Sequence, residues 1–437
     1  MEDYASQIVK AAVKQGAQDA VAEVAVDRSH QIRFSRNEPV IANRWRKTTA
    51  SVFLAVDQRV VAGEVSNFSK IPERIGALIK SARAAPKNSG YRGIAKGPFK
   101  YGRASLDRKI TSLEDGADYV EAAVNGALEE GAKETAGSFW RSHEAHYLET
   151  SNGVSAEDER AHVYLSLRAL VSLDSSGHGV SCATKLSQFD PEKAGHKAGR
   201  IAALAKNPKG GKPGTYDILF DPLIFGSLLD QVGARASAWL VDAGLSPFAK
   251  QLGKKVASAA FTLYDDGTAD TLGHRRFDAE GVPVRKKAIV EKGVLKTYLH
   301  NTSTAKKAKV KSTANAGLIA PEPFALVCQP GDWTRDEMFK EVKDGLWLTN
   351  TWYTRFQSYV TGDFSTIPRD GIFRIKNGEI AEVWKDVRLT DNLLGVFKRI
   401  KALSNKTEQV MWWYEVTTPT IAPYALATKV GITKSAM

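Results

Sequence analysis

The segment 206-KNPKGGKPGT-215 constrains the fold of this chain most strongly, because a long helix or strand cannot run through it. Its density of glycine, proline and lysine is typical of a linker. The chain has 437 residues, whereas a single domain usually has about 100–200. We therefore expect two or three domains, with one boundary at this segment.

The same segment superficially resembles a phosphate-binding loop. The motif G-x-x-x-x-G-K-[ST] would require glycine at position 206 and serine or threonine at position 213. The chain has Lys206 and Pro213 instead, so we exclude phosphate binding through this motif.

Residues 1–100 combine helical and extended patterns that predict an N-terminal α/β domain with a mixed sheet. The first predicted helix stops at Gly16, and the second follows Pro72, which suits the first turn of a helix. The predicted elements are helices at 4–15 and 73–84 and strands at 22–26, 31–35, 51–56 and 59–63. Residues 85–100 have little periodicity and mark the end of this domain.

Residues 101–208 predict a central segment of helices and strands. The predicted elements are helices at 115–130 and at 191–205 and strands at 145–150, 162–173 and 178–187. Asp190 suits the N-cap of the second helix, since its carboxylate can accept a hydrogen bond from a free backbone N–H group. Pro191 then occupies the first helical position.

Residues 209–437 predict a strand-rich C-terminal domain. A strand at 216–220 precedes a helix expected at 222–243. Lys292-Gly293 and Asn377-Gly378 indicate two hairpins, because each dipeptide lies between alternating apolar residues. The predicted fold class is α+β, with an N-terminal α/β region of mixed sheet and helices followed by this strand-rich domain.

Charge and hydropathy argue for a cytoplasmic protein that does not contact a membrane. The net charge of +12 is modest for this length. Residues 306–311 and 206–212 are the densest basic segments, but such runs are more often solvated surfaces, so we do not expect nucleic acid as a partner. No apolar run reaches the roughly 18 residues of a membrane span. The first 16 residues lack the apolar core of a signal peptide.

Two patterns that could bind zinc are weak here. His143-Glu144-Ala145-His146 separates its histidines by three positions, whereas H-E-x-x-H peptidases have them four apart on a helix. The flanking residues predict a strand, on which positions three apart point to opposite faces. We interpret these side chains as ordinary polar residues. Cys182 and Cys328 are the only cysteines, which excludes a site of several thiolates, and Cys328 is expected in the core.

Two acidic turns are further candidates. Asp278 and Glu280 resemble paired carboxylates, but they precede a turn at Gly281, where acidic side chains commonly accept backbone hydrogen bonds. We favour a structural or partner-contact role over catalysis. In TGDFS, Asp363 and Ser365 are expected to shape a turn, and no G-x-S-x-G motif is present.

Tryptophan is concentrated in the C-terminal part of the chain. We expect mainly core packing, with an aromatic-lined groove for an extended peptide as the alternative. The tryptophans between residues 333 and 413 are Trp333, Trp347, Trp352, Trp384, Trp412 and Trp413.

The order of the C-terminal blocks resembles the TldD/PmbA family, once described as modulators of DNA gyrase and now viewed as metallopeptidase-like proteins. The resemblance covers most of the chain and is strongest at about 216–403. FDAEGVP (277–283) and TGDFS (361–365) are specific in combination. The matching blocks are YDILFDPLIFGSLLDQV, HRRFDAEGVPVRKKAIVEKGVLKTYL, STANAG, TGDFS and GIFRIKNGEIAEVWKDVRLTDNLLGVF.

The family pairs two related subunits, and this chain resembles the one without the zinc motif. The TldD-type subunit carries H-E-x-x-x-H on the helix after the F-D-P strand end, whereas the PmbA-type (TldE) subunit lacks it. When Leu228-Leu229 is set against the apolar pair before that motif, Asp230, Gln231 and Arg235 replace the histidine, glutamate and histidine. An amide cannot act as a base near neutral pH, and a permanent cation repels zinc.

The resemblance implies a non-catalytic or regulatory subunit of a two-subunit zinc metallopeptidase that acts on unfolded or extended peptides. It implies no catalytic residue and no metal ligand in this chain, and zinc in a TldD-type partner. The positions implied as peptide or partner contacts are Asp278, Glu280, Gly281, Thr361, Gly362 and Asp363. The alternatives are a self-sufficient homodimeric peptidase, a modulator that binds DNA or topoisomerase, and a homo-oligomeric scaffold. Whether the chain is itself an enzyme stays open.

Overall fold

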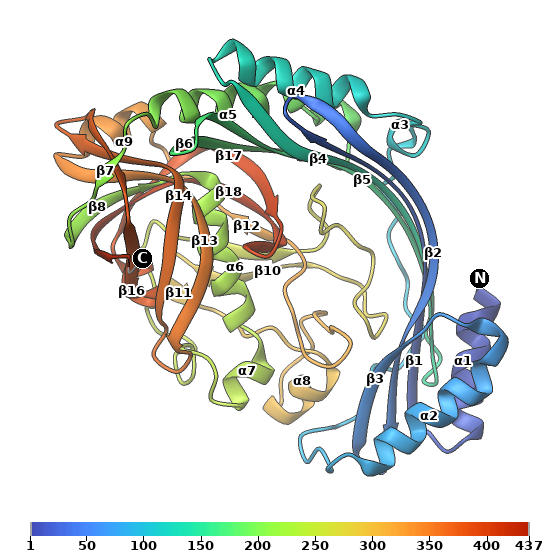
Figure 1. The fold of residues 1–437 in the computed structure, drawn as a ribbon. Coiled ribbons are helices and arrows are strands. Elements are labelled where there is room, and N and C mark those ends of the chain that lie inside the picture. Colours follow the sequence, from blue (N-terminus) through green and yellow to red (C-terminus); the bar gives the residue numbers. More distant parts are fainter. Residues whose placement is uncertain (1, 436–437) are drawn as a thin grey trace.

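A computed structural model describes residues 2–435, which form two β-sheets with helices packed against them (Figure 1). The first sheet has six strands in the order β3-β2-β1-β4-β5-β6 and curves like an arch over the second part of the chain. Its strands are β1 (Asp19–Ser35), β2 (Glu38–Val56), β3 (Arg59–Val65), β4 (Glu134–Thr150), β5 (Ser155–Ser172) and β6 (Ser175–Ala183).

Helices cover the convex face of the first sheet and leave its concave face free of helices (Figure 1). Ala20, Ala22 and Val24 of β1 pack with α1 and α2, and Ile32 and Phe34 of the same face pack with α4. This shared face follows from the two-residue period of a strand. The helices of this part are α1 (Glu2–Lys14), α2 (Ile71–Ala84), α3 (Arg108–Thr111), α4 (Ala117–Glu129) and α5 (Pro191–Leu204), with 3-10 turns at Phe68–Lys70 and Leu186–Gln188.

Every strand pair of the first sheet is antiparallel, so the expectation of a mixed sheet in the N-terminal region was wrong. The reason is local. Arg36-Asn37 and Asp57-Gln58 form tight turns with positive φ, and such short connections can join only antiparallel neighbours. Strand β1 also continues through both segments predicted at 22–26 and 31–35. It pairs with β4, so residues 1–100 and 101–208 contribute to one sheet.

The second sheet has twelve strands and is mixed, since β8 pairs in parallel with β13 and antiparallel with β18. Two β-sheets with separate helices packed against them confirm the α+β fold class. Its strands are β7 (Lys209–Gly210), β8 (Gly214–Phe220), β9 (Leu263–Asp266), β10 (Lys286–Glu291), β11 (Val294–Leu295), β12 (Leu326–Cys328), β13 (Asp344–Ser358), β14 (Asp363–Lys376), β15 (Glu379–Lys385), β16 (Val387–Asn392), β17 (Ile400–Trp412) and β18 (Val416–Lys434).

Helix α6 (Pro222–Arg235) lies in the centre of the C-terminal core and is buried along most of its length. Asp221 caps it by accepting a hydrogen bond from the backbone of Leu223, and Pro222 fills its first turn. The predicted helix at 222–243 breaks after Arg235, and a second helix follows Ser237. The remaining helices are α7 (Ala238–Asp242), α8 (Thr302–Ala308), α9 (Arg335–Glu341) and α10 (Leu393–Lys398).

Local signals placed several elements correctly. Asp190 accepts a hydrogen bond from the Lys193 backbone at the start of α5. Both predicted hairpins are present, with positive φ at Lys292 and Gly293 and at Asn377 and Gly378. None of the helices within residues 2–435 is long and apolar enough to cross a membrane.

Candidate functional site

A cavity of about 1290 Å³ lies between the concave face of the first sheet and the C-terminal domain. Strand β1 contributes every second residue from Asp27 to Ser35, as expected for one face of a strand, together with Phe34 beside the irregularity in its pairing with β2. Strands β4 and β5 continue this polar face, and the β17–β18 hairpin closes the opposite side. A cavity for a small molecule usually has about 300–1,000 Å³. The volume therefore suits a larger ligand, such as an extended peptide.

Aromatic side chains form part of the cavity wall. Trp352 of β13 and Trp413 at the tip of the β17–β18 hairpin line it, with 37% and 65% of their surface exposed. Trp347 and Trp384 are instead buried in the C-terminal core. Core packing and an aromatic-lined groove, which the sequence offered as alternatives, therefore both occur in this cluster of tryptophans.

Asp230, at the first position of the degenerate motif, fixes the start of β18 beside the cavity. Its buried carboxylate accepts hydrogen bonds from the backbone N of Thr417 (3.2 Å), the Thr417 hydroxyl (2.9 Å) and the backbone N of Thr418 (3.1 Å). Thr417 itself lines the cavity. The acceptor capacity of Asp230 is thus used within the chain.

The other two motif positions do not supply metal ligands. The Arg235 guanidinium lies over the rings of Phe356 (4.8 Å) and Tyr359 (4.6 Å), and its burial lowers its pKa. Gln231 is half-buried and has a neutral amide. Across residues 2–435, no group of three or more His, Cys, Asp or Glu side chains is arranged to hold a metal ion. The residues present do not fit a zinc centre, which needs about three protein ligands and a water.

The histidines of the H-E-x-H stretch lie on strand β4 and contact carboxylates of β1, β4 and β5. His143 contacts Glu159 (2.6 Å), and His146 contacts Glu23 (2.9 Å) and Glu144 (3.1 Å). The hydrogen bond from His146 lowers the pKa of Glu144 to about 2. His143 and His146 thus contact different carboxylates, and their spacing on strand β4 places them on opposite faces, as predicted.

Asp278 and Glu280 connect distant loops through backbone hydrogen bonds. Asp278 accepts from the backbone of Glu280, Val282 and Ala316 at 2.9–3.0 Å. Glu280 accepts from the backbone of Ala95 (3.2 Å) and Thr302 (3.3 Å). Burial raises the pKa of Asp278 to about 6 and that of Glu280 to about 8.

These contacts agree with a structural role for the two carboxylates. Gly281 completes the turn with φ +78°, and its carbonyl accepts from the Tyr101 hydroxyl (2.7 Å). A contact of Asp278, Glu280 or Gly281 with a peptide or a partner stays a prediction.

The TGDFS segment forms the turn between β13 and β14. The Thr361 hydroxyl donates to Asp363 (2.5 Å), and the Asn392 amide donates to the same carboxylate (2.9 Å). Gly362 has φ +83°, which favours glycine. The turn-shaping role predicted for Asp363 matches this geometry, whereas contacts of Thr361, Gly362 and Asp363 with a peptide or a partner stay predictions.

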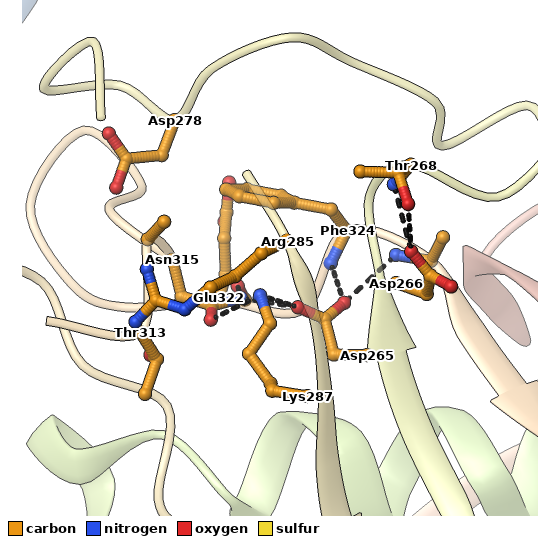
Figure 2. A network of polar contacts seen from close by, with 12 residues as sticks. Asp265, Asp266, Thr268, Asp278, Arg285, Lys287, Thr313, Asn315, Glu322 and Phe324 are labelled. Carbon is orange, nitrogen blue, oxygen red and sulfur yellow. Dashed lines mark hydrogen bonds and ion pairs between the residues drawn. The ribbon is translucent and has the colours of Figure 1, made fainter. Parts of the chain in front are cut away.

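A buried network around Asp265 was not predicted from the sequence. Asp265 forms an ion pair with Lys287 (2.8 Å) and accepts hydrogen bonds from the Asn315 amide (2.6 Å) and the Phe324 backbone (2.7 Å), as Figure 2 shows. Asn315 belongs to the STANAG block, which was a signal for it. The Lys287 ammonium, the Asn315 amide and the Phe324 backbone N–H are all bonded to Asp265. The network therefore holds loops together and does not expose a reactive group.

Four residues of the cavity wall, from β5, β6 and β14, were not predicted from the sequence. Ser166 and Arg168 of β5, His178 of β6 and Arg369 of β14 all line one end of it. Leu165 and Leu167 are fully buried on the opposite face of β5. This alternation of polar and apolar residues was a readable signal for a strand with one solvated face.

Models of the PmbA/TldA metallopeptidase family match two parts of the chain. The central domain matches residues 102–206, and the C-terminal domain matches residues 213–434. These matches define a metallopeptidase-like protein. The chain belongs to the PmbA/TldD family.

Relatives with related names support this assignment. A protein named metalloprotease from Methanothermobacter thermautotrophicus is 30% identical over 365 residues, which cover 77% of this chain and 78% of the relative. A metalloprotease TldD homolog from Buchnera aphidicola is 29% identical over 48% of this chain and 44% of its own length.

Two solved structures share the fold. TldE from Thermococcus kodakarensis has a TM-score of 0.84 at 18% identity, with 98% of this chain and 100% of that chain covered. A putative modulator of a DNA gyrase from Thermotoga maritima has a TM-score of 0.83 at 22% identity and covers 99% of this chain and 100% of its own. At these identities the likeness concerns the fold.

Proposed function

We propose that this chain is the non-catalytic subunit of a two-subunit metallopeptidase and holds an extended peptide near a partner's zinc centre. The observation that carries this proposal is that the motif side chains of α6 are engaged in contacts within the chain. Asp230 is bonded to Thr417 and Thr418, and Arg235 is stacked on aromatic rings, so the motif positions support packing instead of metal binding.

The cavity supports the peptide-holding part of the proposal. Each of β1, β4 and β5 has neighbours on both edges, so a peptide on this face cannot be added as a further strand. It would be held by side chains of the concave face and by the aromatic residues of the β17–β18 hairpin. Zinc bound by a TldD-type partner would supply the activation of water for hydrolysis.

The test compares the chain alone with the chain mixed with a TldD-type subunit from the same organism. Metal content is measured by mass spectrometry, and cleavage is measured with an unfolded peptide. We expect no zinc above background and no cleavage for the chain alone, and stronger cleavage by the mixture than by the TldD-type subunit alone. About one zinc per isolated chain together with cleavage would overturn the proposal in favour of a self-sufficient peptidase. An equal rate with and without this chain would also overturn it.

A further inference from the structure

The cavity end at Arg168 and Arg369 carries an excess of positive charge. Arg168 is paired with Asp370 (3.2 Å), whose side chain is almost fully buried. Arg369 lies over the Trp352 ring (4.6 Å) and forms no ion pair with any residue in the range 2–435. Burial and the neighbouring Arg168 lower the pKa of Arg369, yet an arginine stays charged at neutral pH. This end thus holds two guanidinium groups and one carboxylate, and only Arg168 is paired with that carboxylate.

His178 adds no charge at this end, because its ring is buried and neutral. Burial lowers its pKa to about 3. The cluster of Arg168, Arg369, Asp370 and His178 therefore has a net charge of about +1 near neutral pH. A cation in a partly desolvated site is stabilised by an anionic ligand with hydrogen-bond acceptors.

The tautomer of His178 follows from the orientation of Asn350. The Asn350 amide nitrogen donates to the Asp370 carboxylate (2.7 Å), and its oxygen accepts from the Thr351 backbone N (2.8 Å). A carboxylate cannot donate and a backbone N–H cannot accept, so this orientation is unambiguous. The same nitrogen lies 3.0 Å from His178 Nδ1, which must therefore accept. The ring proton of neutral His178 is on Nε2.

This tautomer makes Ser166 a donor toward the cavity rather than a nucleophile. His178 Nε2 lies 2.8 Å from Ser166 Oγ and donates its proton to it. A base that activates serine needs Nε2 unprotonated. The hydrogen-bonded series from Ser166 through His178 and Asn350 to Asp370 therefore cannot activate the serine as a nucleophile. The Ser166 hydroxyl can instead donate its own proton to a ligand.

The opposite end of the same face is acidic. Asp27 of β1 and Glu144 of β4 lie directly opposite each other in the strand register, and both line the cavity. Like charges in such a pair are unfavourable unless a cation is nearby. His146 contacts Glu144, whereas Asp27 accepts from the Ser29 and Ser142 hydroxyls. In the strand register, Ser166 lies opposite Ser138 and Arg168 opposite Ala136, six and eight positions of β4 from Glu144. These separations are about 20 and about 26 Å at about 3.3 Å per residue.

We propose that Arg168, Arg369 and Ser166 bind the C-terminal carboxylate of an extended peptide whose chain runs along the concave face toward Asp27 and Glu144. The carboxylate neutralises the excess charge of the arginines and accepts the proton of Ser166. The distance between the two charged ends corresponds to a peptide of about six to eight residues. This inference rests on the proposed peptide-holding function and specifies the ligand of that cavity.

The test is direct binding to the full-length chain by isothermal titration calorimetry, without zinc or a partner subunit. Three versions of one seven-residue peptide are compared: a free C-terminus, a C-terminal amide, and an amide whose last residue is glutamate. We expect the free carboxylate to bind about tenfold or more tightly than either amide, which is about 1.4 kcal/mol. Equal binding of all three, tight binding of the glutamate amide, or no binding of the free acid at millimolar concentration would each overturn the inference.

Arg369→Gln is the diagnostic variant, because Arg369 has no carboxylate partner whose burial would be left uncompensated. We expect it to bind the free acid and the plain amide equally. Arg355→Gln is the matched control, since Arg355 is also stacked on an aromatic ring, Tyr353 (3.8 Å), but lies outside the cavity wall. It should keep the full preference for the free acid. A preference retained by Arg369→Gln would contradict the assignment. The proposed subunit role is tested by cleavage with a partner, so either proposal can fail alone.

Discussion

The ammonium of Lys197 on α5 lies 2.7 Å from the carboxylate of Asp221, the N-cap of α6. The same ammonium contacts Glu408 of β17 (2.8 Å). Three elements on both sides of the linker therefore meet at one cation. Close approach of α5 to the first sheet is possible because Gly179 of β6 has no side chain: a Cβ there would lie 2.0 Å from the Ala194 carbonyl oxygen.

Lys197→Met should destabilise the protein strongly. It leaves Asp221, whose side chain is fully buried, without its partner, and breaking a buried pair costs about 3–5 kcal/mol. The measurement is the free energy of unfolding in urea. Lys401→Met is the control, because Lys401 pairs with Glu341 at an exposed position, where such pairs contribute about 0–1 kcal/mol. Similar losses for both variants would contradict the role of Lys197.

Asp230→Ala should destabilise the start of β18. The variant removes the acceptor of three hydrogen bonds, and bonds to a charged group contribute about 1.5–3 kcal/mol. We expect a loss of about 2–3 kcal/mol in urea unfolding. Gln231→Ala, at the neighbouring half-buried position, should cost less than about 1 kcal/mol. An unchanged midpoint for Asp230→Ala would show that the carboxylate is not a structural anchor.

Restoring the lost motif should not restore a peptidase. The combined changes Asp230→His, Gln231→Glu and Arg235→His introduce two imidazoles and a carboxylate, but the surrounding residues would still lack a further ligand and the groups that orient it. We expect neither stoichiometric zinc by mass spectrometry nor peptide cleavage. A TldD-type protein with its natural motif serves as the positive control. Cleavage by the triple variant of this chain would disprove the expectation.

Glu280→Gln should change how stability depends on pH. Burial raises the pKa of Glu280 from its ordinary value of 4.5 to about 8. Between these values the folded protein retains a proton that the unfolded chain loses, so stability falls as pH rises, by up to roughly 1.4 kcal/mol per pH unit. Glutamine is neutral throughout and can accept the same backbone hydrogen bonds.

From pH 5 to pH 8 the native chain should therefore lose more unfolding free energy than the Glu280→Gln variant. Urea unfolding at both pH values measures it. Glu379→Gln, on the exposed start of β15, is the control and should show no such trend. A difference independent of pH would contradict the raised pKa.

Short stretches of sequence were enough to predict several elements, because their causes are local. Asp190 and Pro191 start α5 through a side-chain cap and a fixed φ, and Asn377-Gly378 adopts the positive φ angles of a tight hairpin turn. The family and the absence of a zinc motif on α6 could also be inferred from the order of residues. The full length of β1 could not be predicted. Its polar middle part is extended because β2 and β4 pair with it on both sides, and these partners are distant in sequence or joined by a turn.

The sequence by itself determined the α+β class, the family and the identities of Asp230, Gln231 and Arg235. Only the tertiary structure decided what surrounds them and where a ligand can bind. Arg168 and Asp370 are 202 positions apart, and His178 and Asn350 are 172 apart, yet they form one cluster at the cavity. Contacts over such separations arise from the pairing of strands and the packing of two sheets, which depend on the whole chain and leave no local pattern.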